Sequence, residues 1–193
     1  MIKTRACSSL VAMLLFVYAA PALQEKSKSV EDTANSGLIY GTDHSFTLTA
    51  PTGWVLDNSS GVSQGLHAVF YRRGSSWKDA VAVMYARAVH KNSEKKTLED
   101  VVQADVADFK KSSKDSTATD GSPLPTRDKK TALVRFFYDG ANKNYEAVAF
   151  IDEPKVVVLL ALTSRTKDDY ENSLAAFKEL VGSYYFISDK VNQ

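Results

Sequence analysis

The sequence predicts an α+β domain built on an antiparallel β-sheet, and three observations lead to this. Short segments in the first part alternate polar and apolar residues, as half-buried strands do. Near residue 97 the apolar period changes to that of an amphipathic helix. Three further apolar segments with short links then precede a second helical segment, which favours an antiparallel meander covered by a helix.

Residues 1–22 have the three parts of a secretory signal peptide. Lys3 and Arg5 give a positive start, Leu10–Ala20 is a short apolar run, and residues 20–22 form a small–x–small cleavage pattern. The run is shorter than the roughly 20 residues that cross a bilayer. We therefore expect an exported protein, periplasmic or extracellular, with no transmembrane segment after the signal is removed.

Cysteine and charge exclude several classes of function. The only cysteine, Cys7, precedes the apolar run, so it is misplaced for a lipid anchor and leaves the mature chain without a thiol or disulfide. The 24 basic and 23 acidic residues nearly cancel. This balance argues against nucleic-acid binding, which needs a concentrated basic face.

The mature chain divides into a tether and one domain. Residues 23–37 are polar and lack aromatics, which is typical of a flexible tether. Residues 38–193 then form a single domain in this interpretation. Its length is sufficient for one substantial hydrophobic core.

The first strand is predicted at residues 45–49, where Phe46 and Leu48 alternate with polar residues. Pro51 interrupts strand pairing, Gly53 permits a turn, and Trp54 covers the edge of the core. We interpret this element as a structural corner and not as a binding motif. Two further strands are expected at residues 65–73 and 80–89.

A helix is expected from Thr97, since apolar residues between positions 98 and 109 recur on one helical face. The segment 112–130 is polar and contains Pro123 and Pro125, so we expect a long loop. Long loops in compact domains are often functional or disordered. This one is our leading candidate for a partner-binding segment, with plain disorder as the alternative.

The second half predicts three strands at residues 131–138, 144–151 and 156–163. The last is apolar on both faces, so we expect a central strand that is covered on both sides. A second helix follows at residues 166–181, with Gly182 as its stop signal. Residues 183–187 are expected to add a short final strand.

This element order, together with the P-x-G-W element of residues 51–54, resembles the PsbP-like superfamily over residues 38–187. The superfamily includes extrinsic PsbP subunits of photosystem II, a nuclear protein that binds a small GTPase, and exported bacterial proteins. The resemblance implies a twisted antiparallel β-sheet flanked by helices on both faces, an αβα sandwich. It also implies a binding or assembly module, and it transfers no site residue, metal or cofactor to this chain.

The three histidines, His44, His67 and His90, are the only candidates for a metal site. Three histidines suffice for zinc, but these lack the short spacing of a helical His pair. Each lies at the end of a predicted strand, so we expect solvated side chains and assign no metal ligand. Adjacent antiparallel strands could bring two of these histidines together, and a metal site is the alternative in that case.

Other candidate chemistry has a simpler structural interpretation. No Gly-x-Ser-x-Gly elbow or phosphate-binding loop is present, and Ser122 falls in the expected loop. The acidic pair at 152–153 is typical of a turn, and the pair at 168–169 suits the first turn of a helix. We therefore assign no catalytic residue and no cofactor.

Two surface features remain open. Arg72 and Arg73, with Trp77 and Lys78 nearby, could contact an anion or a partner, although basic residues at a hairpin end are usually solvated. Asn58 begins a glycosylation triplet, which matters only in a eukaryotic secretory pathway.

These observations favour an exported, non-enzymatic binding or accessory module of the cell envelope with a protein partner. One alternative is an exported hydrolase or metal-dependent enzyme whose residues meet only in the fold. Another is a small-ligand carrier with a pocket between sheet and helix, lined by Trp54, Phe70 and Tyr145.

Overall fold

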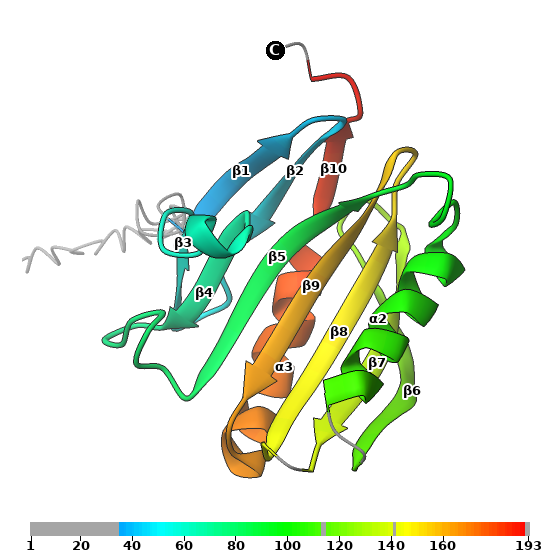
Figure 1. Cartoon of the computed structure of the whole chain (residues 1–193). Coiled ribbons are helices and arrows are strands. Elements are labelled where there is room, and N and C mark those ends of the chain that lie inside the picture. The colour runs from blue at the N-terminus through cyan, green and yellow to red at the C-terminus, as the bar shows by residue number, and fades with distance from the viewer. Residues whose placement is uncertain (1–34, 113–114, 141, 192–193) are drawn as a thin grey trace, which may run out of the picture.

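The computed structural model describes residues 35–112, 115–140 and 142–191. The expected signal peptide and residues 23–34 of the expected tether lie outside them. The strands and helices, shown in Figure 1, are β1 Ser36–Gly41, β2 His44–Thr49, β3 Trp54–Asp57, a short 3₁₀ helix Val62–Gln64, β4 Ala68–Arg72, β5 Ala82–His90, α2 Leu98–Ser112, β6 Ser116–Pro125, β7 Thr131–Asp139, β8 Asn144–Asp152, β9 Val156–Ser164, α3 Lys167–Ser183 and β10 Tyr185–Ser188.

Seven strands form one large antiparallel sheet in the order β3-β4-β5-β9-β8-β7-β6. The prediction of an α+β fold with a large antiparallel sheet is confirmed. Strand β9 occupies the centre, and its residues from Val156 to Leu162 are all buried. The central strand expected from its two apolar faces is therefore confirmed as well.

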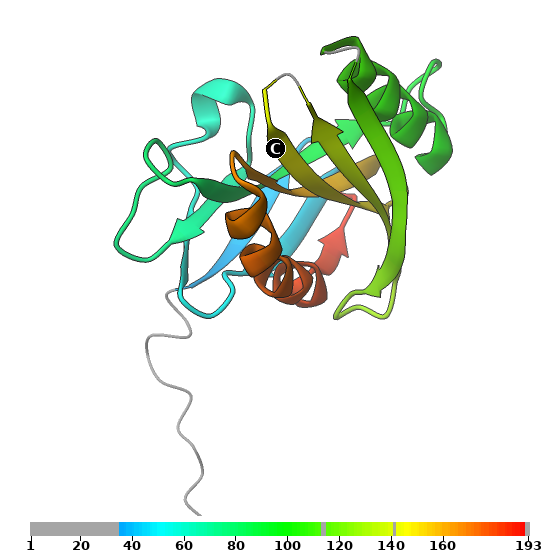
Figure 2. The same cartoon turned by 90° about the horizontal axis from the view of Figure 1, so that it is seen from below.

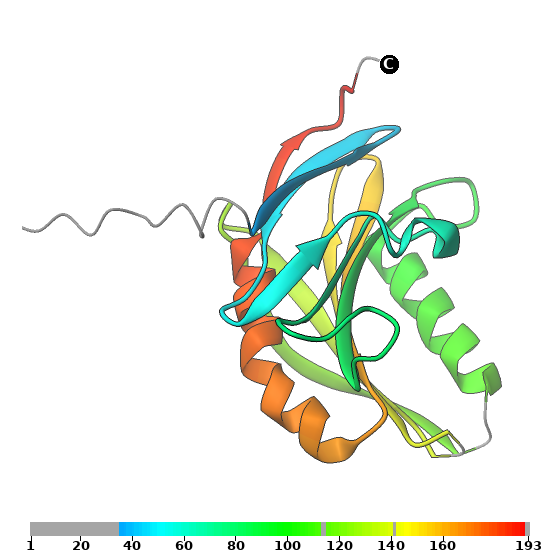
Figure 3. The same cartoon turned by 90° about the vertical axis from the view of Figure 1, so that its left-hand side faces the viewer.

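Alternate residues of the central strands contact different helices. Ala147, Ala149 and Leu160 belong to a core cluster that includes Phe177 of α3. Residues of opposite parity, such as Val148 and Leu159, belong to a second cluster that includes Val101 and Val102 of α2. Figures 2 and 3 show α2 and α3 with the strands of the large sheet between them.

A separate three-stranded sheet has the order β1-β2-β10. Its inner side contributes Ile39, Phe46 and Leu48 to the α3 cluster, where Phe46 packs on Tyr184 with ring centroids 5.2 Å apart. Strand β1 begins at Ser36, slightly before the expected start of the domain. The small sheet therefore covers part of the same core as α3.

The P-x-G-W element is a corner over the core, as interpreted from the sequence. The Trp54 amide donates to the Pro51 carbonyl at 2.9 Å, and Gly53 has a φ of 79°, which favours glycine. Trp54 opens β3 and is 2% exposed. The guanidinium of Arg72 lies 5.4 Å from the centre of the Trp54 ring, so this arginine supports the corner.

The expectation of a long loop at residues 112–130 is wrong. Strand β6 fills most of this segment, and it pairs with β7 from Ser116 to Pro125 with an irregularity between Gly121 and Leu124. An edge strand tolerates polar residues on both faces, and it tolerates proline where pairing is interrupted. The stop at Gly182 is also slightly misplaced, because α3 continues to Ser183.

Candidate functional site

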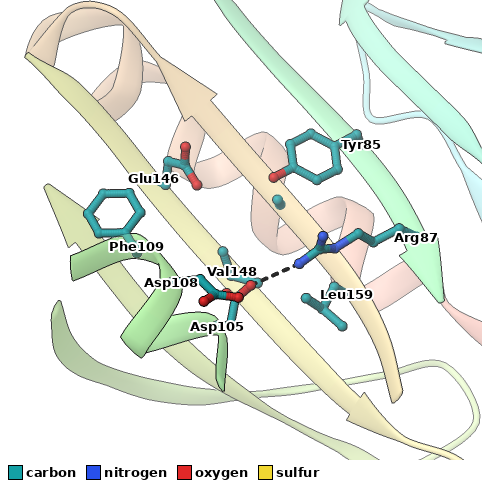
Figure 4. A pocket seen from close by; sticks show the side chains of 9 residues that line it. Tyr85, Arg87, Asp105, Asp108, Phe109, Glu146, Val148 and Leu159 are labelled. Carbon is teal, nitrogen blue, oxygen red and sulfur yellow. Dashed lines mark hydrogen bonds and ion pairs between the residues drawn. The ribbon is translucent and has the colours of Figure 1, made fainter. Parts of the chain in front are cut away.

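A small cavity lies between α2 and the large sheet, and Figure 4 shows the side chains around it. Its volume is about 110 Å³. One water molecule takes roughly 30 Å³ of liquid volume, so the space suits a few waters or a very small molecule. The lining comes from β5, β8, β9 and α2 and comprises Tyr85, Arg87, Asp105, Asp108, Phe109, Glu146, Val148, Leu159 and Ala161.

Strand register explains why polar side chains meet here. Tyr85 pairs with Ala161 of β9, and Arg87 pairs with Leu159 two residues away. Strand side chains alternate between faces, so residues two apart point to the same side. Asp105 then reaches toward the sheet from α2, and Figure 4 shows it facing Arg87.

Glu146 is a half-buried acid that lines this cavity. Burial raises its pKa, and the neighbouring Asp105 adds to the effect. Two hydrogen bonds lower the pKa of Glu146 and so partly offset this rise. The Asn144 amide donates to Glu146 Oε1 at 2.6 Å, and the Thr163 hydroxyl lies 3.3 Å from the same oxygen. Glu146 is therefore an acid in a partly desolvated site, and its hydrogen bonds within the described ranges reach Oε1.

Arg87 and Asp105 form the charged side of the cavity. Arg87 Nη2 donates to Asp105 Oδ1 at 2.8 Å. Burial raises the pKa of Asp105, while the Arg87 charge lowers it. Arg87 Nε is buried and has no hydrogen-bond partner among the described residues. The cavity thus combines an acid, an ion pair and the half-buried phenol of Tyr85, whose pKa is raised by burial.

The pocket residues expected from the sequence lie elsewhere. Trp54 and Phe70 are packed in the α3 cluster, and Tyr145 stacks between Tyr138 and Tyr170. None of the three lines the cavity beside α2. A pocket between sheet and helix does exist, but on the opposite side of the sheet from the expected apolar core residues.

The structure brings the three histidines together. The ring centroids of His44 and His67 are 5.1 Å apart, and those of His44 and His90 are 6.0 Å apart. The expectation of solvated side chains is wrong for His44, which is 1% exposed. Burial lowers the pKa of both His44 and His67, so both favour the neutral ring.

The predicted acidic pairs have structural roles. Glu153 is buried and accepts hydrogen bonds from Tyr184 Oη at 2.9 Å and from Lys130. Asp152 pairs with Lys91 at 2.6 Å. At the start of α3, the Thr166 hydroxyl accepts from the Asp169 amide at 3.1 Å, as a helix cap does.

The remaining sequence candidates are spread over the surface. Ser122 is exposed on the edge strand β6. The Arg72 guanidinium lies over the Trp54 ring and donates a hydrogen bond to the Ser173 hydroxyl at 3.3 Å. Trp77 and Lys78 line an open hollow beside Tyr71. The exposed Asn58 is followed by Ser59 and Ser60, whose hydroxyls donate to Asp57.

Sequence reasoning missed an exposed apolar face on the small sheet. Leu38 and Tyr185 both pair with Thr47, so the three side chains form one row across β1, β2 and β10. Tyr40 and Ile187 continue the face, and Arg127 lies over the Tyr185 ring at 5.0 Å. The exposed fractions are 54% for Leu38, 66% for Tyr40, 45% for Tyr185 and 51% for Ile187.

No family model and no curated protein sequence matches this chain. The solution structure of cyanobacterial PsbP (CyanoP) from Synechocystis sp. PCC 6803 does match, with a TM-score of 0.51 and 16% identity over 80% of this chain and 94% of that chain. The chain has a PsbP-like fold.

A second solved structure with the same fold is LpqN of Mycobacterium tuberculosis, described as involved in cell envelope biogenesis. It matches with a TM-score of 0.54 and 14% identity over 83% of this chain and 98% of that chain. At these identities the common feature is the fold, and no site residue transfers from either protein. None of the helices in the described ranges is long and apolar enough to cross a membrane.

Proposed function

We propose that this protein is an exported accessory module of the cell envelope that binds a protein partner and does not act as an enzyme. The N-terminal signal pattern supports export. The PsbP-like fold supports an accessory role, and the likeness to LpqN favours the envelope. In this proposal the two helices and the large sheet form a rigid αβα frame, which presents the small sheet to the partner.

The exposed face of the small sheet is the observation that carries this proposal. Four large apolar side chains stand on one surface of a sheet whose other surface is packed in the core. Such patches mark interaction sites more often than scattered single residues do. Tyrosine and arginine are also enriched at protein interfaces, and here Tyr40, Tyr185 and Arg127 are part of the surface.

Site-specific photo-crosslinking in the native host tests the proposal. A photoreactive residue at Tyr40 or Ile187 should give a discrete crosslinked species. Val62 provides a matched control, because it is 63% exposed but lies outside the small sheet. Equal crosslinking at Val62 and Tyr40, or none at either face position, would contradict the proposal.

A second candidate function is a small-ligand carrier, which the cavity beside α2 favours. Its preformed polar groups, Glu146, Arg87 and Asp105, suit a small molecule with both donors and acceptors. Native mass spectrometry of protein purified gently from its host should then show a retained small molecule. The mass difference should disappear in Leu159→Trp, which fills the cavity, and persist in the exposed variant Val62→Trp.

A further inference from the structure

All three histidines of the chain meet at the junction of the two sheets. His44 opens β2 of the small sheet, His67 precedes β4, and His90 ends β5 of the large sheet. Their sequence separations are long, so only the fold brings them together. Ring contacts of 5.1 and 6.0 Å centre on His44, the most buried of the three.

Hydrogen bonding fixes which nitrogen of His44 has a free lone pair. Its Nδ1 lies 3.0 Å from the Thr42 carbonyl oxygen. A carbonyl only accepts, so the proton sits on Nδ1 and Nε2 keeps its lone pair. Nε2 is buried and has no hydrogen-bond partner among the described residues. Metal-binding histidines have this arrangement, with the second nitrogen bound to a carbonyl or carboxylate.

His67 shows a second unpartnered nitrogen. Its Nδ1 is likewise buried and without a hydrogen-bond partner in the described part of the chain. Buried polar atoms are nearly always paired, so two orphan nitrogens on adjacent imidazoles are unusual. A ring nitrogen with a free lone pair is what a metal cation needs from histidine.

The backbone beside His44 leaves room for its ring. Gly41 pairs with His44 across the β1–β2 hairpin. A Cβ at Gly41 would lie 2.7 Å from His44 Cε1 and 3.0 Å from Nε2, which is too close for another side chain. Glycine at this position therefore lets the ring lie against the hairpin, with the nearby Asp43 carboxylate held by Lys155 at 2.8 Å.

The spacing of the His44 and His67 rings suits a shared ion. Two imidazoles bound to one tetrahedral zinc at about 2.0–2.1 Å have ring centres about 5 Å apart. His44 and His67 already have this separation. The ring of His90 would have to come about 1 Å closer to that of His44, and His90 is exposed, so a change of its side-chain rotamer would not disturb the core. As the side chains stand, no three His, Cys, Asp or Glu residues in the described ranges are arranged to hold a metal.

We propose that His44, His67 and His90 bind a divalent transition-metal ion of the zinc class, with His90 closing on it and water as the fourth ligand. Imidazole ligands select such ions over Mg²⁺ or Ca²⁺. The site would join the small sheet to the large one through a coordinate bond. It is separate from both the cavity beside α2 and the exposed face of the small sheet.

Metal binding to the untagged mature protein tests this, since a polyhistidine tag would mask it. Calorimetry with Zn²⁺ should show one site per chain, and Co²⁺ should give the intense visible bands of a tetrahedral complex. The variants His90→Gln and His67→Gln should each weaken Zn²⁺ binding at least tenfold. Ser93→Ala, an exposed change close to His90 in sequence, should bind like the wild type.

Two results would overturn the proposal. One is no saturable uptake of Zn²⁺ or Co²⁺ by the wild type. The other is uptake that His90→Gln and His67→Gln leave unchanged, which would indicate scattered surface binding. His90 is exposed, so its variant should fold normally, and a circular dichroism spectrum like that of the wild type verifies this.

Discussion

The two faces of the large sheet use the same strands for different purposes. On the α3 side, Leu160 of β9 pairs with Ala86 and Ala149 in neighbouring strands, and all three are fully buried. On the α2 side, one residue along, Leu159 pairs with Arg87 beside a polar cavity. The α3 face is closely packed with apolar side chains. The α2 face is packed less closely, because it contains a cavity lined by ionisable side chains.

The largest expected effect comes from Leu160→Ala on the α3 face. Truncating a fully buried leucine should lower the free energy of unfolding by about 3 kcal/mol. Leu159→Ala should cost less, about 2 kcal/mol, because that side chain already borders a cavity and has fewer atoms around it. Urea denaturation of both variants measures the difference. An equal or larger loss for Leu159→Ala would show that the two faces are packed alike.

The next effect concerns the ion pair beside α2. Arg87→Met leaves Asp105 half-buried without its partner, and we expect a loss of about 1–2 kcal/mol, since the pair is partly exposed. The double variant Arg87→Met with Asp105→Leu should recover most of it, because it removes the unpaired charge as well. A double variant less stable than Arg87→Met alone would mean that the pair is a net stabilising contact.

A smaller effect is the pH dependence caused by Glu146. Its pKa is raised in the folded state, so folding holds the proton more tightly, and stability is lost as pH rises above the ordinary value of 4.5. Glu146→Gln removes this contribution. Each tenfold difference in proton affinity between the folded and unfolded states corresponds to about 1.4 kcal/mol.

Denaturation of Glu146→Gln and the wild type between pH 4 and pH 8 provides the test. The variant should gain relative to the wild type as pH rises. Glu153 is unchanged in both proteins. Asp105 interacts with Glu146, so the difference reports the titration of Glu146 together with its coupling to Asp105. A constant difference across this range would show that the carboxyl group titrates normally.

The smallest effect on stability is expected on the outer face of the small sheet. Leu38→Ser removes an exposed side chain, so the free energy of unfolding should change by less than about 0.5 kcal/mol. The same substitution should abolish the crosslink formed from Tyr40. Thermal denaturation together with crosslinking would separate these outcomes, and a large destabilisation would assign Leu38 to the core.

Apolar periodicity predicted the parts of the fold that are buried most evenly. Both helices were identifiable because their apolar residues follow one clear period, and strand β9 was identifiable because its apolar run is continuous. Strand β6 was not, because it is a largely polar edge strand with only a few partly buried positions, and these follow no clear apolar period. Its place in the sheet follows from pairing with β7, which the sequence of β6 does not encode locally.

The candidate sites left weaker signals in the sequence. Asp105 lies among the apolar positions of its helix, and Glu146 directly precedes the apolar run of β8, so both are charges at core-facing positions. Those two departures from the apolar pattern are the signal that could have located the cavity. The histidine cluster and the outer face gave no comparable signal, because each requires pairing between segments far apart in the chain.

The order of the strands along the chain also determines when the small sheet can be completed during synthesis. Strand β2 pairs on one edge with β1, its neighbour in the chain, but on its other edge with β10, the last described strand, which is synthesised much later. Tyr185 and Ile187 of the outer face arrive in that same segment. A chain whose synthesis has not reached β10 therefore lacks part of the outer face, so any molecule that binds the whole face would bind only the completed fold.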